Sequence, residues 1–499
     1  MPRPFHGCKM RDVKRPARID PHRLLIAVCA LFVLVSTVLV PPTLALGWDE
    51  IVYASRFPPH GPGPEVPFSA PRTRGVPLLI APVAAFSDSV GLLRCYLTLA
   101  AALALYLGFR PWLALAARAG FPAGTVPLAA GLYGGLWTAL FYAGAAMPNH
   151  YVATGLACAV GCFLRVLDGA GGRAYAGLVG GLAAAALMRP HDAVWPGLVL
   201  LAAVPLLAAG RRAGRRRVRW RLSGAVCGGL ALGLVPWAVE AWLRFGGVRE
   251  RLREASGVQG GMSPAFSLPE HAAALDGPLL CRPCGAAGTD WASAGWWLLL
   301  PPLVALGLWA ARAAGRLAWA ALPVAAALAV AVPYLFFLDY AAPRFLLPAY
   351  ALLAPVAAAG ACAALRARAL RARRVLLPVA AVLLVSHLAY QAHQAGLHSG
   401  IQAGAREDWR RMERLLRAHG VEPPCVLRGN SSVIPVAHVA GCAAGEGPAG
   451  PGRASALVLR GRPLPAWAVG AGWRAFPVPG TYNPGWRIAV PPGEGAVRP

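Results

Sequence analysis

Charged residues are scarce in this sequence of 499 residues. Asp, Glu, Lys and Arg together make up 14% of it, whereas a soluble globular domain carries about 25%. Hydrophobic residues make up 57%, and the mean hydropathy is positive, at +0.52. These values exclude a water-soluble protein and indicate a membrane protein with several spans.

Acidic residues are the scarcest charged type, with 21 Asp and Glu against 48 Lys and Arg, for a net charge of +27. Lysine is nearly missing, since Lys9 and Lys14 are the only two. Such an excess of cations serves either nucleic-acid binding or the retention of loops on the cytoplasmic side of a membrane. The cations gather in loops without interleaved aromatic residues, so we expect no nucleic-acid partner.

A convincing signal-peptide cleavage site is also missing. The first apolar run follows a basic N-terminal segment, 1–23, and its length of about 23 residues suffices to cross a hydrocarbon core. We therefore expect it to remain as the first of eleven spans, predicted at 24–46, 91–109, 125–146, 150–166, 174–188, 193–210, 222–242, 292–311, 317–338, 345–365 and 375–397. Residues 174–188 are few and glycine-rich, so a re-entrant element is the alternative there.

The distribution of cations predicts the orientation of these spans. Dense basic clusters at 211–221 and 366–374 fall on the same side as the N-terminus, which the positive-inside rule makes cytoplasmic. The 211–221 cluster should also contact anionic membrane lipids. In a plasma membrane, the outer face then receives loops 47–90 and 243–290 and a C-terminal domain.

The predicted fold class is an all-α polytopic membrane domain, 24–397, with about eleven transmembrane helices. Its first outer loop is rich in proline and apolar, which predicts short interfacial helices. Residues 398–499 contain one amphipathic segment followed by short segments separated by proline and glycine, which predicts a small extracytoplasmic α+β domain.

Four of the eleven cysteines lie in the outer segments. Cys281 and Cys284 form a CxxC pair, and Cys425 and Cys442 lie in the C-terminal domain. On an oxidising face this even number predicts two disulfides with three possible connectivities. A four-cysteine metal site is the alternative.

The sharpest chemical feature is an acidic pair, Asp49 and Glu50, directly outside the first span. Trp48 precedes the pair and Tyr53 follows it. Acidic residues can simply solvate the end of a span, with Trp and Tyr in the aromatic belt. The functional alternative is that one carboxylate removes a proton from an acceptor hydroxyl while the other holds a metal or orients the substrate.

Several short motifs occur in the order found in the polytopic glycosyltransferases of the GT-C fold, and the sequence resembles that superfamily. The motifs are the acidic pair, the stretch ending at Arg74-Gly-Val-Pro77, Leu-Leu-Arg94, Met147-Pro-Asn-His150, Met188-Arg-Pro190 and Asp339-Tyr-Ala-Ala-Pro-Arg-Phe-Leu-Leu-Pro348. The resemblance covers most of residues 24–365. It implies transfer of a sugar, mannosyl or arabinosyl in type, from a polyprenyl-phosphate donor to an extracytoplasmic glycan, lipid or protein.

The resemblance and the residue types together suggest site roles. Asp49 is the expected base, with Glu50 as a supporting carboxylate or metal ligand. The expected ligands of the donor phosphate are Arg344, Arg189, His150 and Arg74, and those of the substrate are Tyr53, Asn149, His191 and Tyr340. Asn149 and His150 stand where relatives often carry an acid, so no cofactor follows from the sequence and a divalent cation is left open.

Two other functions compete with this one. A transporter or flippase of a lipid-linked or small polar substrate usually places ionisable residues near the middle of its spans. The predicted spans here are nearly free of acids, apart from Glu240 near the end of one. A catalytically silent relative that binds a lipid carrier is the third reading.

Overall fold

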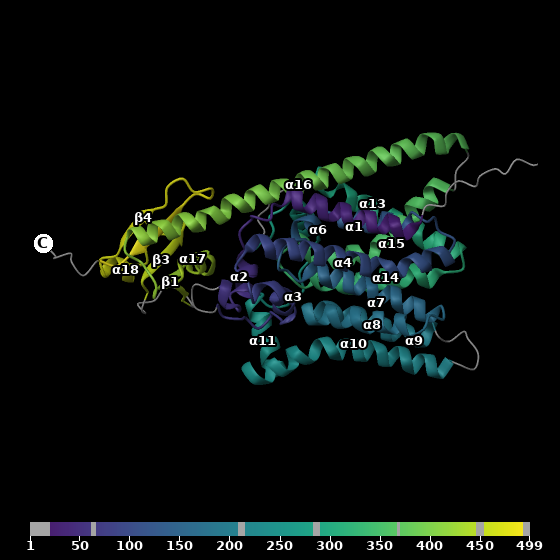
Figure 1. Ribbon diagram of the computed structural model, residues 1–499, viewed down its shortest axis with the longest axis horizontal. Coiled ribbons are helices and arrows are strands. Elements are labelled where there is room, and N and C mark those ends of the chain that lie inside the picture. The colour runs from purple at the N-terminus through teal and green to yellow at the C-terminus, as the bar shows by residue number, and fades with distance from the viewer. Residues whose placement is uncertain are drawn as a thin grey trace, which may run out of the picture.

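The computed structural model describes residues 20–60, 66–207, 215–282, 290–366, 370–445 and 454–492, and most of them are helical (Figure 1). Within these residues, nine helices have the length and composition to cross a membrane. They are α1 (Pro21–Leu39), α4 (Val90–Arg118), α7 (Asn149–Leu167), α9 (Pro190–Leu207), α10 (Arg215–Arg244), α13 (Trp291–Ala313), α14 (Leu317–Phe336), α15 (Leu347–Arg366) and α16 (Leu370–Ala418). The chain is a multi-pass membrane protein, as its composition indicated.

The short, glycine-rich segment expected at 174–188 is a helix of 17 residues, α8 (Gly172–Met188), which packs between α7 and α10. Glycines allow α7 and α8 to approach closely. A Cβ added at Gly155 or Gly181 would lie within 3 Å of the other glycine's carbonyl oxygen. Small residues at a helix contact are the usual means of packing helices in lipid.

The span expected at 125–146 is not one helix. It is divided into α5 (Thr125–Gly134) and α6 (Trp137–Tyr142), because Leu136 between them is extended. The break frees the backbone N–H of Trp137, which donates to the Gln391 side chain on α16 at 2.8 Å. A backbone N–H that is freed within lipid needs such a hydrogen-bond partner. Here α16 supplies the acceptor that the residues next to Trp137 do not provide.

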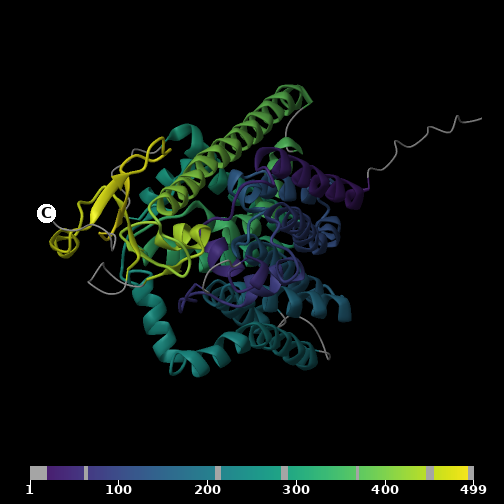
Figure 2. The ribbon, with the colours of Figure 1, turned by 60° about the vertical axis from the view of Figure 1, so that its left-hand side comes forward.

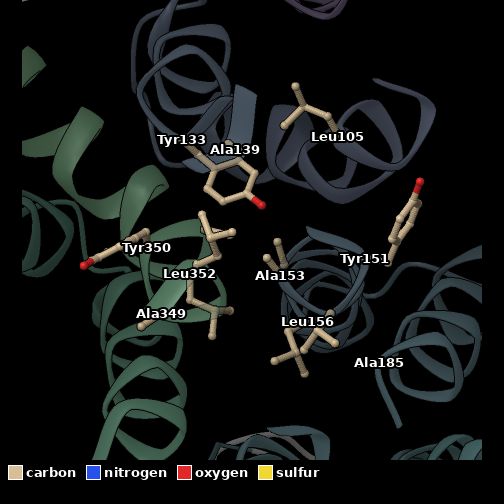
Figure 3. Packing of buried hydrophobic residues seen from close by; sticks show 14 of the residues in the cluster. Leu105, Tyr133, Ala139, Tyr151, Ala153, Leu156, Ala185, Ala349, Tyr350 and Leu352 are labelled. Carbon is tan, nitrogen blue, oxygen red and sulfur yellow. The ribbon is translucent and has the colours of Figure 1, made fainter. Parts of the chain in front are cut away.

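The core of the membrane domain lies among α4, α5, α7 and α15. Figure 3 shows Leu105, Tyr133, Leu156 and Leu352, one from each of these helices, facing a common interior.

Residues 47–90, predicted to form the first outer loop, contain the short helices that their composition predicted, namely α2 (Trp48–Ala54), η1 (Pro58–His60) and α3 (Gly75–Ala84). Asp49 and Glu50 lie in the first turn of α2, where the helix dipole favours negative charge. The second outer loop contains α11 (Val248–Val258), α12 (Leu268–Ala273) and η2 (Ala274–Asp276), and η3 (Pro343–Leu346) precedes α15.

Helix α16 runs past the membrane domain and into the C-terminal domain (Figures 1 and 2). The predicted boundary at 397/398 lies inside this helix. The domain is α+β, with strands in the order β2 (Ala443–Ala444), β1 (Val426–Gly429), β3 (Ala456–Arg460), β5 (Trp486–Val490) and β4 (Arg474–Pro477), accompanied by α17 (Val433–Ala440) and α18 (Ala466–Gly470). The β1 strand is parallel to β2 and β3, and β5 is antiparallel to β3 and β4.

Cysteines of the predicted outer segments form disulfides. Cys425 is bonded to Cys442 beside β1, and Cys281 is also disulfide-bonded. Cys284 lies outside the described residues. The three described sulfurs are therefore not free to form the alternative metal site.

The C-terminal domain contacts the membrane domain next to α2. Trp409 of α16 packs against the cores of both domains, Ile434 of α17 packs on the membrane-domain core, and α17 contacts α2. The helix that carries Asp49 and Glu50 thus contacts both the membrane domain and the C-terminal domain.

Candidate active site

A cavity of about 390 Å³ opens beside the first turn of α2. Its remaining walls come from α4, α6, η3 and α16 and from the loop residues 44, 145, 147 and 279–280. Its lining residues are Leu44, Gly47, Trp48, Asp49, Glu50, Arg94, Phe141, Tyr142, Ala145, Met147, Leu279, Leu280, Arg344, Gln402 and Arg406. Ligand sites commonly combine an apolar wall with a few polar groups in this way.

Asp49 lies between two arginines at this cavity. Its Oδ1 accepts a hydrogen bond of 2.7 Å from Arg72, and its Oδ2 lies 3.9 Å from the Arg344 guanidinium. The Asp49 side chain is 38% exposed. It is thus the accessible carboxylate of the acidic pair, and the structure brings together the expected base and the first expected phosphate ligand.

Arg344 is fixed in place by neutral groups. It donates to the Leu279 carbonyl at 2.5 Å and to the Tyr142 hydroxyl at 3.4 Å. The Asn149 side chain in turn donates to the Arg344 carbonyl at 3.2 Å. Asn149, expected to bind substrate, is buried and contacts the backbone of Arg344.

Glu50 is the buried carboxylate of the pair. It accepts from the backbone N–H of Gly47 at 2.7 Å and of Ala146 at 2.9 Å, and from Arg94 at 3.0 and 3.1 Å. Arg406 lies 3.6 Å away. Each Glu50 oxygen already has two donors, which favours the supporting role over that of a metal ligand.

Arg94 connects Glu50 to two backbone segments, one at residues 44–45 and one at Gly144. It donates to the carbonyls of Leu44, Ala45 and Gly144 at 2.6 to 2.9 Å, in addition to its two bonds with Glu50. Its side chain is 4% exposed. An arginine near the end of a span often extends to the interface, but this one is turned inward and fastens α2 to α4.

Burial would raise the pKa of Glu50, but the charges of Arg94 and Arg406 and the hydrogen bonds from Arg94 and Gly47 lower that pKa to about 2. A carboxylate whose pKa is lower in the folded state contributes stability above its unfolded-state pKa and loses it as the pH falls toward the folded value. Glu50 is therefore ionised throughout the physiological range.

We expect the unfolding midpoint of the wild type to exceed that of Glu50→Gln by a constant margin above about pH 5. The margin should shrink as the pH falls from about 4.5 toward 2, because in that range the unfolded state binds the proton of Glu50 while the folded state does not. Thermal unfolding in detergent across this range measures it. Glu250→Gln, at an exposed ion pair on α11, should show no margin, and a Glu50 margin that shrinks between pH 8 and 6 would contradict the expectation.

A second cluster adjoins Asp49 through Arg72 and Tyr53. The Arg72 guanidinium lies 6.0 Å from the Tyr53 ring centre, and Arg189 interacts electrostatically with Tyr53 and Tyr340. Burial chiefly, and Asp49 next, raise the pKa of Tyr53 to about 12, so Tyr53 keeps its proton. Four of the expected site residues, Tyr53, Arg189, His191 and Tyr340, belong to this cluster.

Within this cluster Arg189 and His191 share a buried acid. The Arg189 Nε lies 3.3 Å from Asp192, whose carboxylate also accepts from the Tyr334 hydroxyl at 2.5 Å. The His191 ring lies 2.8 Å from the same hydroxyl. Arg189 is therefore partly neutralised, while Arg344 keeps only a distant contact with Asp49.

Two expected phosphate ligands lie away from the cavity. The His150 ring is buried, 3.1 Å from the Tyr133 hydroxyl and 2.9 Å from the Ala101 carbonyl. Arg74 bonds Glu240 at 2.9 and 2.5 Å. The sequence showed that His150 begins a helix but not which side of that helix is buried, and the partner of Arg74 is distant in the chain.

Sequence reasoning missed Arg251 of α11. Its guanidinium is fully buried, donates to the carbonyls of Ala70 and Arg72 at 3.1 and 2.8 Å, and pairs with Glu240 at 3.0 Å. It thus holds the backbone of the segment that presents Arg72 to Asp49. The isolated acid Glu240 near a span end was the available signal that a buried cation lay nearby.

The residues around Asp49 do not fit a divalent cation. Within the described ranges, no three His, Cys, Asp or Glu side chains gather closely enough to hold a metal. The near partners of Asp49 are arginines, whereas Mg²⁺ and Ca²⁺ require several oxygen ligands.

Solved structures of membrane glycosyltransferases share this architecture. ArnT from Cupriavidus metallidurans, bound to undecaprenyl phosphate, matches with a TM-score of 0.60 and 13% identity over 95% of this chain and 99% of its own. Its apo form matches with 0.60 and 14%, over 93% and 97%. The oligosaccharyltransferase AglB from Archaeoglobus fulgidus, in complex with an inhibitory peptide and a dolichol-phosphate, matches with 0.50 and 11%, over 87% and 69%.

No protein-family model and no curated protein sequence matches this chain. At 11 to 14% identity the likeness to solved structures shows the fold. The chain has the GT-C fold, as the order of its motifs predicted.

Proposed function

We propose that this chain is an integral-membrane glycosyltransferase that moves a sugar from a polyprenyl-phosphate donor to a hydroxyl of an extracytoplasmic glycan, lipid or protein. The observation that carries the proposal is the partly exposed Asp49 between Arg72 and Arg344, at a cavity beside an interfacial helix. The shared fold supports it, because the solved ArnT and AglB structures hold polyprenyl phosphates.

In this proposal Asp49 accepts the proton of the acceptor hydroxyl as the acceptor oxygen bonds to the anomeric carbon of the donor. The bond from that carbon to the phosphate oxygen breaks, and the polyprenyl phosphate leaves with one more negative charge. Arg344 and Arg72 stabilise that charge, since a guanidinium offers a planar pair of donors to phosphate. Tyr53 and Arg189 extend the same binding region.

The proposed orientation puts the N-terminal segment 1–23 in the cytoplasm and the domain 398–499 outside a plasma membrane, with 24–397 as the transmembrane unit. The Cys425–Cys442 disulfide supports this, because disulfides persist in oxidising compartments. The donor then reaches Asp49 from the outer leaflet.

The test is sugar transfer from a panel of radiolabelled polyprenyl-phosphate sugars to membrane extracts. We expect the wild type to transfer at least one sugar, and Arg344→Ala at matched expression to lose about 10²-fold or more, because a donor to the developing charge is removed. Arg366→Ala, at an exposed end of α15, should retain activity and serves as the control.

Silence of the wild type across the whole panel would contradict the proposal. Uptake of a lipid-linked substrate into vesicles without any transfer would then favour the transporter or flippase. Binding of a polyprenyl phosphate with neither transfer nor uptake would favour a silent carrier-binding relative.

A further inference from the structure

Helix α16 places two polar side chains in the wall of the cavity. Gln402 and Arg406 both line it, and their spacing of four residues puts them on one face of the helix. Helix α16 also enters the C-terminal domain, so this wall is built by the segment that joins the two domains.

Arg406 is buried without being fully paired. Its side chain is 6% exposed, it donates to the Ala45 carbonyl, and it lies 3.6 Å from a Glu50 oxygen that already has two closer donors. Its Nε has no hydrogen-bond partner among the described residues, and that atom is itself shielded from the cavity. Arg406 therefore brings to the cavity lining a positive charge that is offset by a contact of 3.6 Å with Glu50, which suits it to an anionic ligand.

The Arg406 guanidinium lies close to the backbone of Gly47. A Cβ at Gly47 would lie 2.9 Å from the Arg406 Nη2. The turn that starts α2 and the α16 arginine therefore fit each other, and Arg406 is placed beside the acidic pair without forming a close ion pair of its own.

Two arginines in the cavity lining differ in their acidic neighbours, and we call the surroundings of each one an end of the cavity. Arg344 interacts with Asp49, Tyr142 and Arg189, whereas the charged neighbours of Arg406 are Glu50 and Arg94. Tyr142 interacts with both Arg344 and Arg406. The Arg344 end adjoins Arg72 and Asp49, so it serves the donor phosphate in the proposed function and leaves the Arg406 end for the other substrate.

The charges and the aromatic surface of the cavity indicate which kind of acceptor binds near Arg406. Arg94, Arg344 and Arg406 line the cavity against Asp49 and Glu50, and Arg72 adds a further positive charge at Asp49. One dissociated phosphodiester carries a single negative charge, so the site keeps a positive excess after the donor binds. Trp48, 43% exposed beside Gln402 and Arg406 in the lining, offers an aromatic surface to a sugar ring.

We propose that the acceptor carries an acidic group, a carboxylate or phosphate close to the sugar that is modified, and that Arg406 and Gln402 bind it. This inference rests on the proposed function and adds the chemical class of the acceptor. An anionic group adds a counter-charge to the Arg406 guanidinium, and Gln402 contributes an amide to the same group. A neutral acceptor leaves Arg406 with its contact of 3.6 Å to Glu50 and its bond to the Ala45 carbonyl.

The test is equilibrium binding to the full-length protein in nanodiscs of neutral lipid, which does not depend on turnover. The probes are methyl β-D-glucoside, methyl β-D-glucuronide and methyl β-D-glucoside 6-phosphate, titrated calorimetrically. We expect at least one acidic probe to bind the wild type about tenfold or more tightly than the neutral one, because a charge-assisted hydrogen bond forms. Comparing the glucuronide with the 6-phosphate shows whether the site prefers a carboxylate or a phosphate.

Variants of the protein show which residues cause the preference for an acidic probe. Arg406→Gln should remove it, and Gln402→Glu should reverse it by repulsion between its carboxylate and the acidic probe. Arg410→Gln, at an exposed arginine one turn further along α16, should retain it, and so should Arg344→Gln.

Equal binding of all three probes by the wild type would overturn the proposal. So would a preference that Arg344→Gln removes and Arg406→Gln retains, since the acidic group would then be read at the donor end. Failure of the transfer assay with this binding preference intact would contradict the proposed function alone.

Discussion

Replacing Asp49 with asparagine should lower the turnover number for sugar transfer by about 10²- to 10⁴-fold, which is the usual contribution of a positioned general base. The amide cannot accept the acceptor's proton, yet it keeps the size of the side chain and can still contact Arg72, which bonds Asp49 at 2.7 Å. We therefore expect the KM for the donor to change little. Initial rates with purified protein at saturating donor measure the loss.

The matched control is Asp88→Asn, at an exposed acid between α3 and α4. It should transfer at the wild-type rate. If Asp49→Asn folded normally and also transferred at that rate, Asp49 would not be the base.

Replacing Arg94 with methionine should destabilise the protein by about 3 to 5 kcal/mol, the usual cost of removing one partner of a buried ion pair. Glu50 would keep its charge with only Arg406 at 3.6 Å and two backbone donors. The carbonyls of Leu44 and Gly144 would also lose their donor. Thermal unfolding followed by size-exclusion chromatography measures the effect.

Arg118→Met is the control for this change, because Arg118 lies on the same helix in a half-exposed pair with Asp168, and such pairs contribute about 0 to 1 kcal/mol. Adding Glu50→Gln to Arg94→Met should recover part of the loss, since the unpaired buried charge is removed. Equal unfolding midpoints for Arg94→Met and Arg118→Met would show that the buried pair is not important for the fold.

The membrane architecture was predictable because lipid imposes apolar length on every span. The break between α5 and α6 was not, because the donor freed at Trp137 is satisfied by Gln391, which is 254 positions away in the chain. Nor was the passage of α16 through the predicted boundary at 397, because a helix can leave lipid for water with no change in its backbone.

The candidate active site was also predictable only in part. The types of residue in the acidic pair and at Arg344 predicted which chemistry could occur, and the structure places Asp49 near Arg344. The different environments of Asp49 and Glu50 were not predictable. Besides the local donor Gly47, the donors to Glu50 come from Arg94 and Ala146, and nothing near residue 50 in the sequence indicates that these two segments converge there.

The 49 residues of α16 form one rod of about 70 Å. In a continuous helix each residue is rotated by about 100° from the one before it. One residue inserted between Pro378 and Gln402 would therefore turn the Arg406 side chain by about 100° away from Glu50. It would turn the sheet beyond it by the same angle. Chains that build their outer domain on such a helix can therefore lengthen it only by nearly whole turns, and the spacing between lipid and cavity changes in steps rather than continuously.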